Sequence, residues 1–162
     1  MWLRPGMYSI PVPAAGRLST MPRPGGDDRL DAEMLAVRGA GVDVLVCLLT
    51  DAERAELGLA AEPAAATGAG LEFHAYPITD FGVPDPDEIR PLLDLLTDQL
   101  RAGRHVAVHC RGGVGRSSLI AAALLVRLGT PTEQAWQVIT AARGVPVPET
   151  EQQRRWPETQ HR

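Results

Sequence analysis

A short apolar run, a cysteine, a glycine-rich loop and a long apolar stretch follow one another between residues 106 and 128 of this 162-residue chain. Residues 106–108, Val-Ala-Val, have the composition of a strand buried in a parallel sheet. From Ser117 onward the chain favours a helix with almost no polar face, which is typical of a helix buried on every side. Strand, loop and buried helix in this order indicate an α/β domain.

The loop between this strand and this helix, residues 111–116, reads Arg-Gly-Gly-Val-Gly-Arg. Its glycines allow backbone N–H groups to point inward, and the N-terminus of the helix adds partial positive charge, so the loop can hold a tetrahedral oxyanion. Arg116 can bind two oxygens of that anion. Such a field also lowers the pKa of a thiol below about 8.5, which makes Cys110 a candidate nucleophile. The residues expected to bind the anion are Arg111, Gly112, Gly113, Val114, Gly115 and Arg116.

The segment His109-Cys110-x5-Arg116-Ser117 resembles the H-C-x5-R-[ST] signature of the cysteine-dependent protein tyrosine and dual-specificity phosphatases. The resemblance implies that Cys110 forms a phosphocysteine intermediate and that Arg116 binds the phosphoryl oxygens. It also implies that the Ser117 hydroxyl stabilises the departing thiolate. His109 would hold the cysteine loop by hydrogen bonding, although a structural core histidine is an equal alternative. No metal or organic cofactor is implied.

Asp80 and Asp85 are the two candidates for the acid that must protonate the leaving oxygen. Both lie in a loop expected to leave the same edge of the sheet as Cys110. Asp85 precedes a proline and lies three residues before Glu88, as a helix N-cap does, which leaves Asp80 without a structural task. The loop also resembles the P-[IF]-x-D-x-G-x-P-D segment of the kinase-associated-phosphatase-like branch, in which the first aspartate is the general acid. We therefore assign this role to Asp80.

Gln153 has two interpretations. Its spacing from Thr150 is that of a capping box, which alone would explain both residues. The segment 149–153 is also similar to the E-T-P-E-Q segment of the same branch, without its proline, and a glutamine there could place the hydrolytic water. Gln152 is a weaker candidate for that task. Cys47 is expected to be an inert core residue, although some members of the family protect their nucleophile with a second cysteine.

The remaining pattern predicts a central, mostly parallel sheet of four to five strands with helices on both faces. Residues 1–162 are expected to form a single phosphatase domain, in which residues 1–16 can add an edge strand. Short apolar segments at 7–12 and 17–21, within the proline- and glycine-rich stretch 1–25, indicate one or two edge strands, and residues 42–49 and 71–78 indicate buried strands. Thr50 is expected to cap one helix, and Thr130 with Glu133 has the spacing of a capping box for another.

Composition limits the partners. The net charge of −4 argues against nucleic acid or an anionic membrane surface as the main partner. Two cysteines are too few for a disulfide framework, and a catalytic thiol needs a reducing compartment. No run approaches the roughly eighteen apolar residues of a membrane span. We therefore expect a cytoplasmic protein without membrane insertion, and we expect a monomer.

These observations favour a protein phosphatase acting on phosphotyrosine, with phosphoserine and phosphothreonine as further substrates. Phosphoinositides and other phosphorylated small molecules are the alternative. Arg111 is the only extra basic residue in the loop, and the chain contains no lysine, which argues against the lipid. A sulfurtransferase or arsenate-reductase-type enzyme and a non-catalytic phosphate-binding module are more distant alternatives, because neither needs an acid beside a nucleophile.

Overall fold

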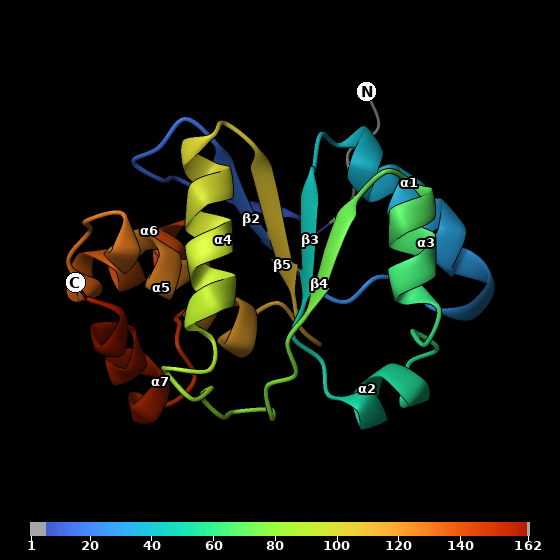
Figure 1. Cartoon of the computed structure of the whole chain (residues 1–162). Coiled ribbons are helices and arrows are strands. Elements are labelled where there is room, and N and C mark those ends of the chain that lie inside the picture. The colour runs from blue at the N-terminus through green and yellow to red at the C-terminus, as the bar shows by residue number, and fades with distance from the viewer. Residues whose placement is uncertain (1–5, 162) are drawn as a thin grey trace.

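A five-stranded sheet in the order β1-β2-β5-β3-β4 forms the centre of the computed structural model, which describes residues 6–161 (Figure 1). Four strands are parallel, and the short β1 runs antiparallel to β2 at one edge. The mostly parallel sheet predicted from the sequence is confirmed. The strands are β1 (Tyr8–Ile10), β2 (Arg17–Met21), β3 (Val44–Cys47), β4 (Glu72–Ala75) and β5 (His105–His109).

Helices cover both faces of the sheet, as predicted (Figure 1). Helices α4, α5 and α6 lie on one side, and α1 and α3 lie on the other. The helices are α1 (Leu30–Gly39), α2 (Asp51–Glu56), α3 (Glu62–Gly68), α4 (Arg90–Arg101), α5 (Gly115–Arg127), α6 (Thr132–Arg143) and α7 (Glu151–Arg155), with 3-10 turns η1 (Asp27–Arg29) and η2 (Trp156–Gln160).

Successive side chains along each strand point to opposite faces of the sheet, so the core is divided into two clusters. In β3, Val44 and Val46 pack toward the α4–α6 side, whereas Leu45 and Cys47 pack toward α1 and α3. Helix α5 contributes most to the first cluster, because all of its residues except Arg127 are buried. The burial of α5 matches the prediction of a helix without a polar face. Helix α5 begins at Gly115, within the loop of residues 111–116 that follows Cys110 (the cysteine loop).

Two local predictions are wrong. Strand β2 is not an edge strand, because it pairs with both β1 and β5; the prolines around it lie outside Arg17–Met21, so the ladder keeps all of its donors. Helix α6 begins two residues after Thr130, with Pro131 at the N-cap and no side-chain capping bond. The Thr130 N–H instead donates to the Leu125 carbonyl of α5.

The predicted cap at Thr50 is present as a complete capping box with Glu53.

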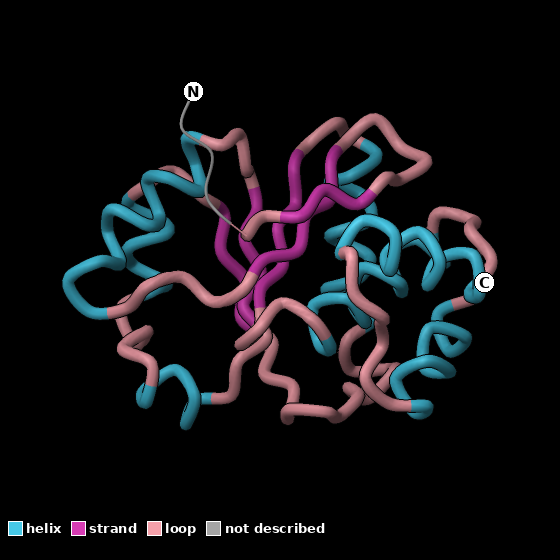
Figure 2. The backbone as a smooth tube through the Cα atoms, turned by 180° about the vertical axis from the view of Figure 1, so that it is seen from behind, coloured by secondary structure: helices cyan, strands magenta, loops and turns pink. Residues whose placement is uncertain are grey.

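The functional loops gather at one end of the sheet. Because the parallel strands share one direction, their carboxyl ends release the chain after β3, β4 and β5 at the same edge. Helices α2 and α7 and the loop after β4 lie beyond that edge (Figures 1 and 2). This is the place where parallel α/β sheets bind their ligands.

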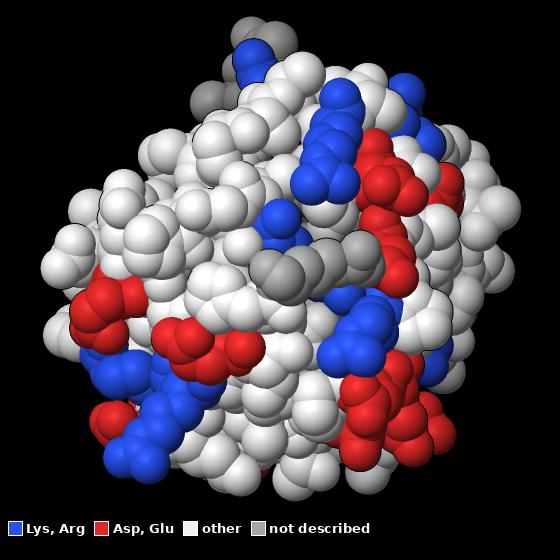
Figure 3. All heavy atoms as spheres, turned by 60° about the vertical axis from the view of Figure 1, so that its left-hand side comes forward, with Lys and Arg blue, Asp and Glu red and all other residues white. Residues whose placement is uncertain are grey.

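The surface seen in Figure 3 carries arginines and carboxylates in mixed groups, without a large area of one sign. That face therefore offers no continuous basic surface of the kind that binds a nucleic-acid backbone. Within residues 6–161, no helix is both long enough and apolar enough to cross a membrane.

Leu124→Ala should lower the free energy of unfolding by about 2–5 kcal/mol, because the side chain is fully buried in α5 and the substitution leaves a cavity. Leu35→Ala is the matched control, since Leu35 is 61% exposed on α1 and its truncation should cost roughly 0.5 kcal/mol or less. Urea unfolding of both variants measures the difference. Equal effects would mean that α5 does not form the core described here.

Candidate active site

A cavity of about 230 Å³ opens between the cysteine loop, the loop after β4 and the segment before α7. Its small volume and its lining by backbone and charged groups suit a phosphoryl group. Sequence reasoning identified most of the lining but not Phe81 or Glu149. The lining residues are Asp80, Phe81, Cys110, Arg111, Gly112, Val114, Gly115, Arg116 and Glu149.

Gly113 was predicted to bind the anion, but it does not line this cavity. It has φ of +73°, and a Cβ there would lie 2.8 Å from the backbone carbon of Met21. Its carbonyl accepts a hydrogen bond of 2.8 Å from Arg143 Nε. Gly113 therefore packs the loop against the end of β2, and its contact with an anion stays a prediction.

Cys110 lines the cavity and contacts Ser117 of α5. Cys110 is 3% exposed, and its Sγ is 3.4 Å from the Ser117 Oγ at the start of α5. The thiol donates to this oxygen, and a thiolate would accept from the same hydroxyl. The arrangement thus places a donor where a negative sulfur needs one.

Arg116 is almost fully buried and is held by Glu53 of α2. Its Nη1 and Nη2 donate to the two Glu53 oxygens at 2.7 and 3.0 Å, and Nη1 also donates to the Ile78 carbonyl at 2.9 Å. These hydrogen bonds from Arg116 lower the pKa of Glu53 from 4.5 to about 2, against the opposing effect of burial. The sequence analysis did not identify Glu53, because nothing along the chain shows that its carboxylate reaches residue 116.

The Nε of Arg116 is buried and has no hydrogen-bond partner among the described residues. A buried donor without a partner is costly unless a ligand or water completes it. Glu53 and Ile78 fix the guanidinium while leaving this nitrogen available. The geometry therefore indicates an anion that accepts from Arg116 Nε when the cavity is filled.

Asp80 and Asp85 have different surroundings. Asp80 is half exposed on the cavity wall, with its Oδ1 3.4 Å from Arg116 Nη2. Asp85 does not line the cavity; its Oδ1 accepts from the N–H groups of Asp87 and Glu88 at 2.9 and 3.0 Å. Asp85 therefore caps the turn before α4 and not, as predicted, the helix itself, which begins at Arg90 with Ile89 as its N-cap. Only Asp80 of these two residues lines the cavity.

Gln153 is fully buried and joins the C-terminal segment to the loop of Asp80. Its backbone N–H donates to Thr150 Oγ1 at 3.1 Å, while its side chain accepts from the Glu149 N–H at 3.1 Å and donates to the Gly82 carbonyl at 3.5 Å. It also lies beside Gly115, where a Cβ would overlap the Glu149 carboxylate. Gln152 is exposed. The Thr150 cap is therefore present, but the capping box is incomplete, because the Gln153 side chain accepts from Glu149 and not from Thr150. The role of Gln153 in placing the hydrolytic water stays a prediction.

Arg111 lies at the exposed rim. Its guanidinium pairs with Glu56 at 3.3 Å and with Glu53 at 3.8 Å. A surface arginine with two carboxylate neighbours contributes little free positive charge to the cavity. The rim is therefore less basic than the sequence of the loop suggests.

His109 lies on the other face of the sheet, next to Cys47 and Glu62. The ligand atoms of these buried side chains lie within 4.8 Å of one another, the only such group within residues 6–161. The 2.6 Å between His109 Nε2 and Glu62 Oε2 is a hydrogen-bond distance, shorter than the roughly 3.3 Å between two ligands of tetrahedral zinc. Glu62 and His109 are therefore held to one another by a direct hydrogen bond.

Cys47 and Cys110 are both free thiols that pack in different core clusters, on opposite faces of the sheet. A disulfide requires Cβ atoms that point toward one another. This geometry does not favour a protective disulfide between them, and Cys47 belongs to the core as expected.

Comparison with known proteins gives consistent results. A family model described as "Polymorphic toxin system, DSP-PTPase phosphatase" matches residues 19–130. Human cyclin-dependent kinase inhibitor 3 is 39% identical over 77 residues, which cover 46% of this chain and 36% of that protein. The chain spans about a third of the length of such curated relatives.

Solved structures share the fold along almost the whole chain. Kinase associated phosphatase, with its catalytic-site cysteine replaced by serine, has a TM-score of 0.85 at 24% identity and covers 93% of this chain and 90% of that one. The active form of Tk-PTP has a TM-score of 0.79 at 26% identity and covers 99% of this chain and 98% of that one.

Glu53→Gln should make the free energy of unfolding less dependent on pH in the acidic range. The pKa of Glu53 is about 2 in the folded protein against 4.5 unperturbed, so its stabilising contribution is complete above pH 4.5 and is lost as the pH falls toward 2. Glutamine does not titrate. Urea unfolding at about pH 7 and about pH 3 should show a gap between wild type and variant that narrows in acid. A difference in free energy of unfolding that is the same at both pH values would contradict the lowered pKa of Glu53.

Proposed function

This chain belongs to the DSP-PTPase phosphatase family, and we propose that it is a protein phosphatase that hydrolyses phosphotyrosine through a phosphocysteine intermediate. The observation that carries the proposal is the grouping of Cys110, Asp80 and the unpartnered Arg116 Nε around one small cavity. Nucleophile, acid and anion-binding group are the three parts that this reaction needs.

In the first step the Cys110 thiolate attacks phosphorus. A sulfur–phosphorus bond forms, the phosphorus–oxygen ester bond breaks, and Asp80 gives its proton to the leaving oxygen. Arg116 and the inward-facing amides of the cysteine loop stabilise the charge on the equatorial oxygens. The helix N-terminus at Gly115 adds to this field.

In the second step water attacks phosphorus and the sulfur–phosphorus bond breaks. Asp80, now ionised, takes the proton from the water, and the Ser117 hydroxyl donates to the departing thiolate from 3.4 Å. We propose that Gln153, which lies beside Gly115 and contacts the Asp80 loop, orients that water. We keep this as the role of Gln153 in addition to its capping contact.

Two features favour an aromatic phosphoester in a protein as the substrate. Phe81 lines the cavity, is 56% exposed and has φ of +61°, so an apolar ring stands beside the acid. Arg111 is engaged by carboxylates, which leaves little basic surface for a polyanionic lipid headgroup. Because catalysis needs a free thiol, we also propose a reducing compartment such as the cytoplasm.

Cys110→Ser should abolish turnover of para-nitrophenyl phosphate while leaving the fold and phosphate binding intact. The serine hydroxyl lacks the nucleophilicity of a thiolate at neutral pH. Wild type should turn over this substrate in the presence of a chelator and should be inhibited by vanadate, which mimics five-coordinate phosphorus. A variant with a tenth of wild-type activity would rule out the mechanism. Phosphopeptide and phosphoinositide panels then identify the substrate class.

Asp80→Ala should lower kcat by roughly 10²–10⁴-fold and flatten the alkaline limb of the pH–rate profile, because the proton donor is lost. KM should change little, since the anion-binding groups remain. Asp85→Ala is the matched control; it should cost about 1 kcal/mol of stability through loss of a cap and leave kcat nearly unchanged. The opposite outcome, a kinetic defect only in Asp85→Ala, would show that Asp85 and not Asp80 is the acid.

A further inference from the structure

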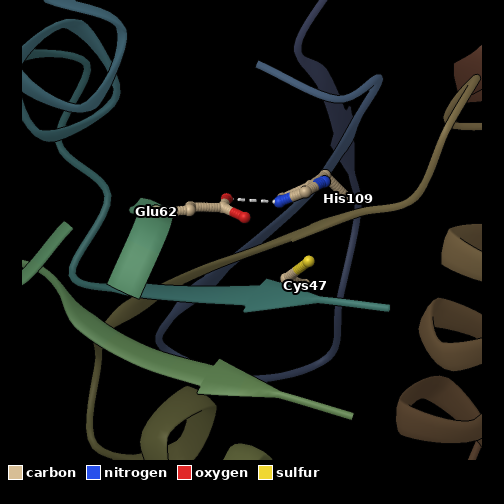
Figure 4. Close-up of side chains that lie close together, drawn as sticks. All are labelled: Cys47, Glu62 and His109. Carbon is tan, nitrogen blue, oxygen red and sulfur yellow. Dashed lines mark hydrogen bonds and ion pairs between the residues drawn. The ribbon is translucent and has the colours of Figure 1, made fainter. Parts of the chain in front are cut away.

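Behind the cysteine loop, on the face of the sheet away from the cavity, two ionisable side chains point at one another (Figure 4). Glu62 Oε2 and His109 Nε2 are 2.6 Å apart, and both side chains are fully buried. His109 immediately precedes Cys110 at the end of β5. Glu62 begins α3, 47 residues earlier in the chain.

This pair is costly for the fold. A buried carboxylate needs compensation by charge and hydrogen bonds, yet Glu62 Oε1 has no partner among the described residues. Burying such a pair commonly stabilises a protein no more than apolar side chains of similar volume would. Stability alone therefore does not account for a carboxylate at this position.

The surroundings fix the protonation of His109. Nε2 faces the Glu62 carboxylate, and Nδ1 lies 3.4 Å from the Cys110 carbonyl oxygen. Both neighbouring oxygens can accept a hydrogen bond, which favours hydrogen on both ring nitrogens, as in the imidazolium form. Burial lowers the pKa of His109, but the charge and hydrogen bond of Glu62, together with those of Cys47, outweigh burial and raise that pKa from 6.5 to about 10.

Few other groups reach the ring. From β3, its register partner Cys47 adds a thiol contact, and from β2 the register partner is the apolar Met21. Among the described residues, Glu62 and Cys47 are the titratable groups that act on His109. Glu62 is thus the carboxylate that can hold the imidazolium.

We propose that Glu62 is a positioning residue for the reaction: by holding His109 as an imidazolium against the Cys110 carbonyl, it keeps a positive charge behind the nucleophile. This charge favours the Cys110 thiolate over the thiol. The inference rests on the proposed function, in which that thiolate attacks phosphorus. A carboxylate outside the cavity therefore sets the pH range in which the nucleophile is ready.

The test compares Glu62→Gln with wild type by the pH dependence of Cys110 alkylation with iodoacetamide, mapped by mass spectrometry. Glutamine keeps the size of the side chain but cannot hold the imidazolium, so the midpoint should rise by about 1–2 pH units. The acidic limb of kcat/KM should move by the same amount. A purely structural pair would change stability and leave both midpoints in place.

The controls separate the possible failures. Glu72→Gln removes a second, partly exposed glutamate–histidine pair, Glu72–His74 at 2.8 Å on β4, and should leave the midpoint unchanged. Glu62→Asp keeps the charge and should give an alkylation midpoint between those of wild type and Glu62→Gln. This variant tests the inference if Glu62→Gln does not fold. NMR of the imidazole rings should show a His109 cation at pH 7.5 in wild type and its loss in Glu62→Gln.

An unchanged midpoint in a folded Glu62→Gln variant, or a neutral His109 in wild type, would overturn the inference. The alkylation measurement does not require turnover. Absence of phosphatase activity in wild type would therefore contradict the proposed function alone, whereas an unshifted alkylation midpoint would contradict the role of Glu62 alone.

Discussion

The burial of α5 against the central strand is the constraint on which the site depends. Strand β5 lies between β2 and β3, and α5 packs with nearly all of its surface in the core, so the link between them can only be a tight turn at the sheet edge. The turn is tight because Gly113 packs on the backbone of Met21. Consequently the thiol of Cys110, the start of α5 and Arg116 are fixed relative to one another before any ligand binds.

Two cations beside this turn are each held by a carboxylate from the chain that follows β3. Glu53 of α2 holds Arg116, and Glu62 of α3 holds His109 on the face of the sheet that packs against α1 and α3. Neither carboxylate lines the cavity. The two cations therefore lie nearer to the thiol and to the anion-binding cavity than their partner carboxylates do. Positive charge fixed in this way before the reaction is the preorganised electrostatic environment that phosphoryl transfer needs.

Sequence reasoning reached the strand–loop–helix unit because its signals are local: apolar period, glycines and a short motif. It also separated Asp80 from Asp85, since the capping pattern of Asp85 is contained within four residues. It missed Glu53 as the partner of Arg116, because the contact spans 63 residues and depends on where α2 lies over the sheet edge. The cap at Thr130 was wrong for a related reason: packing of α5 and α6 set the helix start, and the local pattern did not.

The contact between Asp80 and Arg116 links binding to chemistry. The Asp80 carboxyl lies 3.4 Å from a guanidinium nitrogen of Arg116, and both side chains line the same cavity. A phosphoryl group bound by Arg116 would therefore have its ester oxygen within reach of Asp80. In the proposed reaction the departing ester oxygen takes the proton of Asp80, and this leaves the carboxylate that the water of the second step requires.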